Sequence, residues 1–344
     1  MELPNYSDLK KALPLYLSQK NFIEQSQKTV KRILNSTDDR LLIIVGPCSI
    51  HDLSAAKEFA IFLKELSHQV EQSCFLVMRT YFEKPRTALG WKGFIYDPYL
   101  DSSSKVAEGI VYMRQFLLEL ASLNVPVATE FVDPFLAPYY DDLISWGSIG
   151  ARTSSSQIHR QLASSLSMAV GFKNAVSGHL SSAIDGALFA SYPHNYVGLS
   201  QDGTLSTLCS NGNIDAHIVL RGGETSPNYN PASIQQALQQ LKLAGLPGRL
   251  IVDASHHNSR KEANQQMEVF QAIMEQIVNG TSQIRGIMLE SNLYFGSQQI
   301  SALSDLKYGV SITDSCLDLK RTKELIYSAA VLLEQKYRSQ PVFI

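Results

Sequence analysis

The stretch "LLIIVGPCSIHD" (residues 41–52) decides the fold. Its apolar run from Leu41 to Val45 shows no polar alternation, ends at Gly46-Pro47, and is followed at once by Cys48. A short apolar run of this kind is typical of a parallel strand that is covered on both faces. The residues alone leave two interpretations of Cys48 open: a buried thiol at a strand end, or a thiolate placed there for chemistry.

Seven similar runs follow along the chain, and helical patterns separate most of them. The runs are residues 75–80, 125–131, 148–153, 169–174, 217–223, 249–256 and 284–291. The clearest helix is "PASIQQALQQLKLA" (231–244), with Asn230 as N-cap, Pro231 at the first helical position and Gly245 as a stop. Strand–helix alternation repeated in this way predicts an α/β fold, a (β/α)8 TIM barrel.

Two segments do not fit the alternation. Residues 1–40 precede the first strand and are interpreted as an N-terminal extension with an oligomer or regulatory role, before a catalytic barrel over 41–344. Residues 195–210, "NYVGLSQDGTLSTLCS", predict a β-hairpin around Gln201-Asp202-Gly203, inserted before the sixth barrel strand.

Composition excludes several classes of partner. The 344 residues carry a net charge of −2 with no block of like charges, which disfavours nucleic acid and anionic membranes. No run of 18 apolar residues and no secretory signal are visible, and the four cysteines have no disulfide-framework spacing. We therefore expect a cytoplasmic protein with free thiols.

Each predicted strand ends in a polar or reactive residue, and in a barrel these ends share one rim. One arginine at a strand end is usually a surface ion pair, whereas a full ring of such residues indicates a site. Several cations in the ring, with more in the loop after the second strand, predict a polyanionic ligand or two anionic ligands, and the alternative is a ring of salt bridges. The strand-end residues are Cys48, Arg79, Glu130, Arg152, Lys173, Arg221, His256 and Glu290, and the loop cations are Lys84, Arg86 and Lys92.

Three of the strand-end residues, Cys48, His256 and Glu290, are candidate metal ligands, together with Asp314 in the loop after the eighth strand. A thiolate, an imidazole and carboxylates suit one divalent Mn, Fe, Co or Zn ion better than Mg, which prefers oxygen ligands. Their separation in the sequence gives no spacing motif. His257 follows His256, and because neighbouring side chains on an extended chain point to opposite sides, we expect at most one of the two to face the site.

At this point the motifs resemble a known family. "GPCSIHD", "MRTYFEKPRTALGWKG", "GARTSSSQIHR", "GFKN", "LRGG", "DASHHNS", "MLESN" and "YGVSITDSC" are similar to type I 3-deoxy-D-arabino-heptulosonate 7-phosphate (DAHP) synthases, from about residue 5 to residue 335. The motif "KPRT" separates this family from related synthases that use arabinose 5-phosphate.

The resemblance implies a metal-dependent condensation of phosphoenolpyruvate with erythrose 4-phosphate, the first step of the shikimate pathway. It further implies that Lys84 protonates the new alkoxide and that Glu130 orients a water. The implied ligands are Arg152, Lys173, Arg221 and the Ala151 amide for the enolpyruvyl phosphate, Arg79 and Lys173 for its carboxylate, Lys84, Pro85, Arg86 and Thr87 for erythrose 4-phosphate, and Cys48, His256, Glu290 and Asp314 for the metal.

The resemblance also implies feedback inhibition by an aromatic amino acid, with tyrosine favoured, and a homodimer or homotetramer. The matching inhibitor positions are Leu162, Leu166, Ser167, Tyr196 and Gly198, and the alternative is that these residues only pack a helix against the hairpin. Two other functions stay open: a sugar-acid synthase acting on arabinose 5-phosphate, and a non-catalytic sugar-phosphate sensor.

Overall fold

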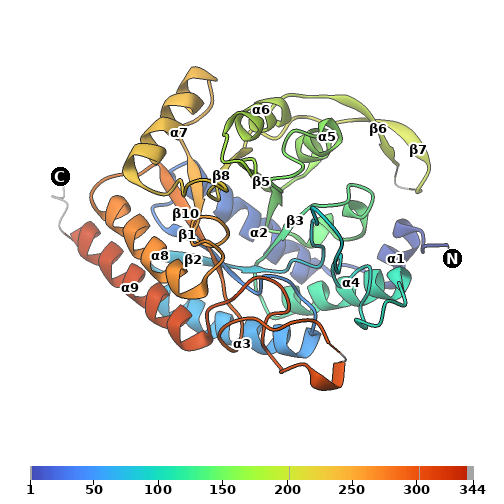
Figure 1. Cartoon of the computed structure of the whole chain (residues 1–344). Coiled ribbons are helices and arrows are strands. Elements are labelled where there is room, and N and C mark those ends of the chain that lie inside the picture. Colours follow the sequence, from blue (N-terminus) through green and yellow to red (C-terminus); the bar gives the residue numbers. More distant parts are fainter. Residues whose placement is uncertain (1, 201, 302, 339–344) are drawn as a thin grey trace.

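The computed structural model describes residues 2–200, 202–301 and 303–338 and contains a closed barrel of parallel strands (Figure 1). The strands follow one another around the barrel in the order β1-β10-β9-β8-β5-β4-β3-β2. Their bounds are β1 Leu41–Gly46, β2 Cys74–Arg79, β3 Val127–Glu130, β4 Trp146–Ile149, β5 Ala169–Lys173, β8 His217–Leu220, β9 Leu250–Asp253 and β10 Ile284–Glu290. The predicted TIM barrel is confirmed.

All eight apolar runs overlap a barrel strand, and the fourth needs the largest correction. We predicted a strand over 148–153, whereas β4 ends at Ile149 and the chain then turns. The carbonyl of Gly150 accepts hydrogen bonds from the amides of Thr153 and Ser154, and this turn ends the strand. Ala151 and Arg152 therefore lie in a loop at the rim.

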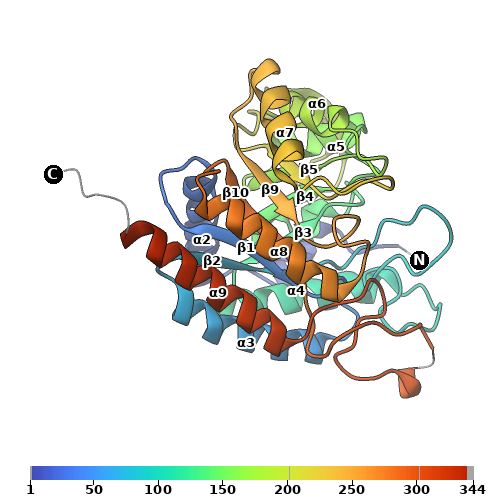
Figure 2. The same cartoon turned by 60° about the vertical axis from the view of Figure 1, so that its left-hand side comes forward.

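Helices surround the barrel (Figures 1 and 2). Helix α7 has the predicted ends: the Asn230 side chain accepts from the Ser233 amide at 2.9 Å, and Gly245 follows with φ +70°. The surrounding helices are α3 Leu53–Val70, α4 Val106–Ser122, α5 Gln157–Ser165, α6 Ser181–Ala190, α7 Pro231–Leu243, α8 Ala263–Val278 and α9 Leu319–Arg338.

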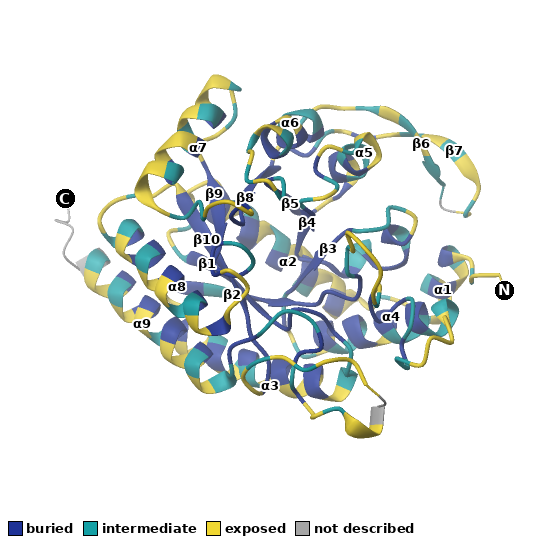
Figure 3. Cartoon of the chain, in the orientation of Figure 1, coloured by how far each residue is buried: buried dark blue, intermediate teal, exposed yellow. Residues whose placement is uncertain are grey.

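The N-terminal segment forms α1 Tyr6–Ala12 and α2 Leu17–Leu34. The apolar face of α2 enters the core, because Val30, Ile33 and Leu34 pack in one buried cluster with residues that line the barrel, among them Leu42 and Trp146. Figure 3 shows this buried interior in dark blue. Helix α2 thus packs against the barrel-lining side chains and leaves the carboxyl ends of the strands to the loops.

The predicted hairpin is confirmed as β6 Asn195–Leu199 and β7 Leu205–Cys209, which pair with each other in antiparallel register. Within the described residues they make no ladder with a barrel strand. Gln201, in the predicted turn, lies outside the described residues. The turn meets the N-terminal segment, since Asn5 Nδ2 donates to the Asp202 carbonyl at 2.7 Å.

No helix in the described part of the chain has both the length and the hydrophobicity that a membrane crossing requires.

Candidate active site

Three of the four predicted metal ligands converge at the carboxyl ends of β1 and β10. The ligand atoms of Cys48, Glu290 and Asp314 all lie within 4.8 Å of one another. Glu290 is the last residue of β10 and pairs in register with Gly46, which brings it beside Cys48. Asp314 comes from the loop between β10 and α9. The parallel register thus joins residues far apart in the sequence.

His256, the fourth predicted ligand, lies next to this cluster. It follows β9 in a turn with φ +53°, and its Nε2 atom is 3.8 Å from Glu290 Oε1. Its Nδ1 atom is 2.7 Å from Asp253 Oδ2. A carboxylate on the second ring nitrogen is the usual way of orienting a metal-binding histidine. Sequence reasoning missed Asp253, although its place at the end of the apolar run "RLIVD" was a usable signal.

The electrostatics of the cluster fit a cation. Burial raises the pKa of Cys48 to about 11, the Glu290 charge adds to that rise, and the Lys84 ammonium opposes it. Burial alone would raise the pKa of Asp253, but His256 and Lys173 hold it well below its usual range. A thiol, an imidazole and carboxylates in one buried cluster are donors suited to Mn, Fe, Co or Zn.

Two of the predicted phosphoenolpyruvate ligands are buried cations at the ends of β2 and β5. Arg79 donates to Glu290 at 3.0 Å, and Lys173 Nζ is 2.5 Å from Glu130 Oε2. Both cations lie over the ring of Tyr81, with Arg79 Cζ at 4.0 Å and Lys173 Nζ at 5.2 Å from its centroid. No sequence pattern singles out Tyr81, which contacts both groups.

Arg221 extends the cationic surface from the loop after β8. Its backbone amide donates to Asn174 Oδ1 at 2.8 Å, and its guanidinium is 2.7 Å from His257 Nδ1. His256 and His257 therefore both contact residues of the rim, although we expected at most one of the two to face the site. The cause is the left-handed turn at His256, where the side-chain alternation of an extended chain does not apply.

The loop that carries "KPRT" follows β2 and reaches the metal candidates. Lys84 Nζ donates to the carbonyl and to the sulfur of Cys48, each at 3.2 Å. Burial lowers the pKa of Lys84, but the negative groups at Cys48 and Glu290 outweigh it and raise the pKa, so the ammonium form persists. Pro85 is half-buried, and Arg86 is exposed with its Nε on the Trp91 carbonyl at 2.7 Å.

Arg152 joins this loop to the β4 end of the barrel. It is exposed, and its Nε donates to Thr87 Oγ1 at 2.6 Å. Ala151, whose amide is a predicted phosphate donor, lies half-buried in the same turn. The predicted ligands of the two substrates thus meet at the Arg152–Thr87 contact.

Glu130 is the last residue of β3, and its Oε2 atom accepts a hydrogen bond from Lys173 Nζ. Burial would raise its pKa, but the charge and hydrogen bond of Lys173 lower it to about 2. Gly150 faces it so closely that a Cβ atom there would lie 2.4 Å from Glu130 Oε1. The glycine therefore preserves the space that the carboxylate occupies.

The five predicted inhibitor residues lie on α5, just after it, and on β6. Leu166 and Ser167 border a pocket of about 340 Å³ that residues 209–215 also line. Leu162 is half-buried on α5, and Tyr196 and Gly198 lie on β6. A Cβ at Gly198 would lie 2.8 Å from Leu208 Cδ1, so the neighbouring strand already fills part of the space beside this glycine.

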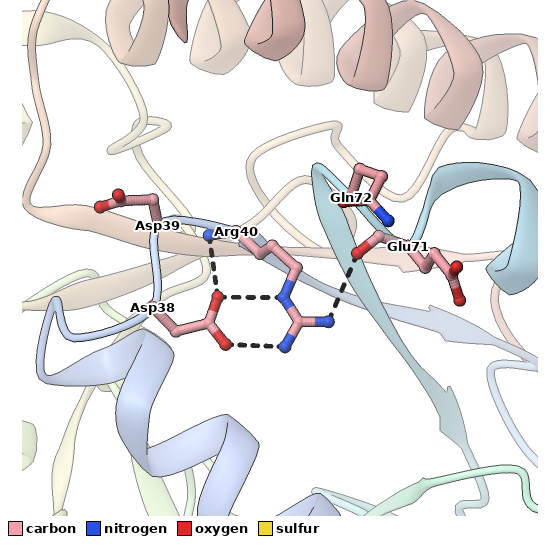
Figure 4. Close-up of a pocket in the computed structure, with 5 residues that line it drawn as sticks. All are labelled: Asp38, Asp39, Arg40, Glu71 and Gln72. Carbon is pink, nitrogen blue, oxygen red and sulfur yellow. Dashed lines mark hydrogen bonds and ion pairs between the residues drawn. The ribbon is translucent and has the colours of Figure 1, made fainter. Parts of the chain in front are cut away.

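A separate pocket of about 460 Å³ lies where the chain enters β1 and β2, away from the rim (Figure 4). Its lining consists of Asp38, Asp39, Arg40, Glu71 and Gln72. The Arg40 guanidinium donates to both carboxylate oxygens of Asp38, at 3.0 and 2.7 Å, and to the Glu71 carbonyl at 3.4 Å. These internal pairings explain the cluster as part of the fold.

The fold and its rim define a class: a TIM-barrel enzyme that gathers cations around a candidate metal centre at the carboxyl ends of its strands. Comparison with known proteins then identifies the family. The sequence model described as the DAHP synthetase I family matches residues 19–326. The chain belongs to this family, as its motifs predicted, and it is a 3-deoxy-7-phosphoheptulonate synthase by class.

Individual relatives support the same family assignment. The chain is 46% identical over 319 residues to a Tyr-sensitive phospho-2-dehydro-3-deoxyheptonate aldolase of Escherichia coli (strain K12), covering 92% of this chain and 89% of that protein. It is 42% identical over 342 residues to a phospho-2-dehydro-3-deoxyheptonate aldolase of Corynebacterium glutamicum, covering 97% and 93%. A solved aldolase of the same name from Francisella tularensis SCHU S4 superposes with a TM-score of 0.95 at 39% identity, covering 98% of each chain.

Proposed function

We propose that this enzyme condenses phosphoenolpyruvate with D-erythrose 4-phosphate to give DAHP and phosphate, and that tyrosine inhibits it. The observation that carries the proposal is the contact between Lys84 and Cys48. Through it, the loop expected to bind the aldose phosphate reaches the group expected to bind the metal. The rim cations lie beside the same groups and fit a substrate with a phosphate and a carboxylate.

Phosphoenolpyruvate is held by cations of differing exposure. Arg152, Lys173, Arg221 and the Ala151 amide bind its phosphate, and Arg79 with Lys173 binds its carboxylate. Because Arg79 and Lys173 are buried, their attraction for an anion is only weakly screened by water. Charge-assisted hydrogen bonds from a fixed guanidinium also orient the enol for attack.

Erythrose 4-phosphate is received by Lys84, Pro85, Arg86 and Thr87. The Arg152–Thr87 contact supports a shared boundary between the two substrates, and in this proposal the enol carbon lies near the aldehyde. Cys48, His256, Glu290 and Asp314 would hold one divalent metal, which when bound would supply Lewis-acid polarisation of the aldehyde oxygen.

The protein's own groups then move the protons. The enol carbon attacks the aldehyde carbon, and Lys84, whose raised pKa keeps it an ammonium, donates a proton to the new alkoxide. Glu130, an anion beside Lys173, orients the water that adds to the carbon bearing the phosphate. Phosphate leaves by cleavage of its bond to that carbon. Holding both anions in register supplies much of the rate.

The test follows the loss of phosphoenolpyruvate absorbance in chelator-treated protein, with erythrose 4-phosphate or arabinose 5-phosphate, and with Mn²⁺ or none. We expect consumption only with erythrose 4-phosphate and only with metal. Consumption with arabinose 5-phosphate would identify the sibling synthase. No consumption with either sugar, by protein that has bound metal, would favour a sugar-phosphate sensor.

Tyrosine inhibition rests on the relative named Tyr-sensitive and on the position of the hairpin. We propose an inhibitor site formed by Leu162, Leu166, Ser167, Tyr196 and Gly198. The contact of Asn5 with the hairpin turn supports a regulatory role for residues 1–40, ahead of the catalytic barrel over 41–344. Activity assays with saturating tyrosine, phenylalanine or tryptophan test whether an aromatic amino acid inhibits the enzyme. Full activity in saturating tyrosine would refute tyrosine inhibition.

The same N-terminal extension is proposed to contribute to a homodimer or homotetramer. Light scattering of the full chain gives the mass directly, and a monomer at assay concentration would contradict this proposal.

A further inference from the structure

Glu83 is a buried carboxyl that the proposed chemistry does not use. It directly precedes Lys84 and is 2% exposed. Its Oε2 accepts from the Tyr140 hydroxyl at 3.1 Å, and its Oε1 accepts from the Asp133 amide at 3.2 Å. The Tyr96 hydroxyl lies 3.5 Å from Oε1 and 3.1 Å from Asp133 Oδ2. The carboxyl thus ties the loop after β2 to the loop after β3.

The partners of Glu83 are rigidly held. Tyr140 lies between two short helices, η1 Ala137–Tyr139 and η2 Asp141–Leu143, and is 2% exposed. Its ring stacks on Phe131, with centroids 5.6 Å apart and planes 6° from parallel. Phe131 follows Glu130 directly. A hydroxyl fixed in this way can hold the carboxyl in one place.

Glu83 and Lys84 reach in opposite directions from the backbone. Glu83 contacts the loop after β3, whereas Lys84 contacts Cys48 in the candidate metal centre. The base of the loop is closed by a hydrogen bond from the Lys84 amide to the Lys92 carbonyl at 2.8 Å. Beyond this base the residues from Arg86 to Gly90 are exposed. The base is therefore fixed while its tip faces solvent.

Gly93 shows how closely this base is packed. It has φ +114°, and a Cβ there would lie 2.2 Å from the Phe82 carbonyl oxygen and 2.7 Å from Glu83 Cα. The segment that closes the loop at Gly93 therefore packs directly against the backbone of Glu83. A shift of the Glu83 carboxyl would be transmitted to Lys84 through one peptide bond.

We propose that Glu83 is a positioning residue, whose carboxyl, held by Tyr140, Tyr96 and the Asp133 amide, fixes the base of loop 84–92 and so sets the place of Lys84. This rests on the proposed function, in which that loop receives erythrose 4-phosphate. The proposed phosphoenolpyruvate ligands Arg79, Lys173 and Arg221 lie at the strand ends and not on loop 84–92, so the effect falls mainly on the second substrate.

The charge state of Glu83 gives the proposal a pH signature. Burial raises its pKa to about 8, the Asp133 carboxylate adds to the rise, and the Tyr140 hydroxyl opposes it. Burial also keeps the pKa values of Tyr96 and Tyr140 above their usual value, so these hydroxyls stay neutral. As pH rises through about 8, a buried charge therefore forms beside Asp133 and loosens the loop base.

The test compares Glu83→Ala, Glu83→Gln and Tyr140→Phe in the full-length, metal-loaded enzyme. For Glu83→Ala we expect the KM for erythrose 4-phosphate to rise about tenfold or more, with the KM for phosphoenolpyruvate changed less than about twofold. In the unmodified enzyme we expect the KM for erythrose 4-phosphate to rise between pH 7 and 9. Glu83→Gln should restore the KM at pH 7 to the unmodified value and should abolish this pH-dependent rise. Tyr140→Phe should shift the KM in the same direction by a smaller factor.

Tyr139→Phe is the matched control, because the neighbouring hydroxyl donates to the Pro4 carbonyl outside this network. It should leave both KM values and the pH profile unchanged. A KM for erythrose 4-phosphate that is unchanged in Glu83→Ala, or a wild-type pH profile in Glu83→Gln, would overturn the proposal. Equal losses for both substrates would assign Glu83 a purely structural role. Failure of the proposed function is distinct, since the unmodified enzyme would then not consume phosphoenolpyruvate.

Discussion

Gly150 lies against Glu130 at the rim and leaves no room for a side chain. Replacing Gly150 with alanine places a methyl group 2.4 Å from Glu130 Oε1, and the carboxylate cannot yield freely because Lys173 holds its other oxygen at 2.5 Å. We expect Gly150→Ala to fold and to lose about 100-fold in kcat, the cost of displacing a catalytic group by about 1 Å. Gly248→Ala is the control, since a Cβ there meets atoms no closer than 3.8 Å. Equal activity of the two variants would contradict this role for Glu130.

Substitution of Cys48 tests its assignment as a metal ligand. Cys48→Ser replaces a soft thiolate donor with a hydroxyl that binds borderline metals weakly. We expect bound Mn, Fe, Co or Zn per chain to fall at least about tenfold at a fixed free-metal concentration, with turnover falling in parallel. Elemental analysis and the absorbance assay measure the two quantities. Cys209→Ser, at an exposed thiol on β7, should change neither. Wild-type metal content in Cys48→Ser would refute thiolate ligation.

Candidate site residues lie close together where strand ends carry them. Cys48 and Glu290 lie beside each other because β1 and β10 pair in register, which the barrel hypothesis already implied. The contacts of His256 with Asp253 and of His257 with Arg221 were not predictable. They depend on a left-handed residue in the turn after β9, and nothing in "DASHHNS" specifies that conformation for a histidine.

Strand β5 offers a test at the level of the element. Gly171 faces the barrel interior, where a Cβ would lie 2.6 Å from Val219 Cγ2 and 2.7 Å from Trp146 Cζ2. These neighbours are fully buried and cannot move aside. We expect Gly171→Ala to lower the free energy of unfolding by about 1–3 kcal/mol, the usual cost of overpacking a core. Denaturant unfolding measures it. A stability equal to that of Gly248→Ala would contradict the packing argument.

Element boundaries were less predictable than the elements themselves. The apolar runs identified all the barrel strands, because strands buried on both faces have few polar residues. The end of β4 was missed, since Gly150 and Ala151 continue the same small, apolar pattern. The turn that ends the strand is a matter of backbone hydrogen bonds from Thr153 and Ser154, which side-chain patterns do not report.

Metal binding should stabilise the whole molecule, because the candidate ligands come from both ends of the chain. Cys48 follows the first barrel strand, whereas Glu290 and Asp314 belong to the last strand and the loop after it. We expect Mn²⁺ at about 100 times its dissociation constant to add about 2.7 kcal/mol to the free energy of unfolding relative to chelator-treated protein. Thermal unfolding measures the shift. A shift of the same size in Cys48→Ser would contradict the ligand set.

At the scale of the molecule, barrel closure could be inferred from the number of strands, but the role of α2 could not. Residues 1–40 looked like an appendage because they precede the first strand. In the structure, Val30, Ile33 and Leu34 pack with the barrel-lining side chains. The amphipathic pattern of one helix does not say which apolar surface will cover it, so this arrangement required the three-dimensional structure.

The self-contained hairpin has an evolutionary consequence. Since β6 and β7 pair only with each other in the described chain, changes there leave every hydrogen bond of the barrel ladder in place. The proposed inhibitor site on this hairpin can therefore change under selection while the barrel stays constant. An engineer who tests the proposed inhibitor site has, in residues 195–209, a segment to redesign at little risk to the barrel.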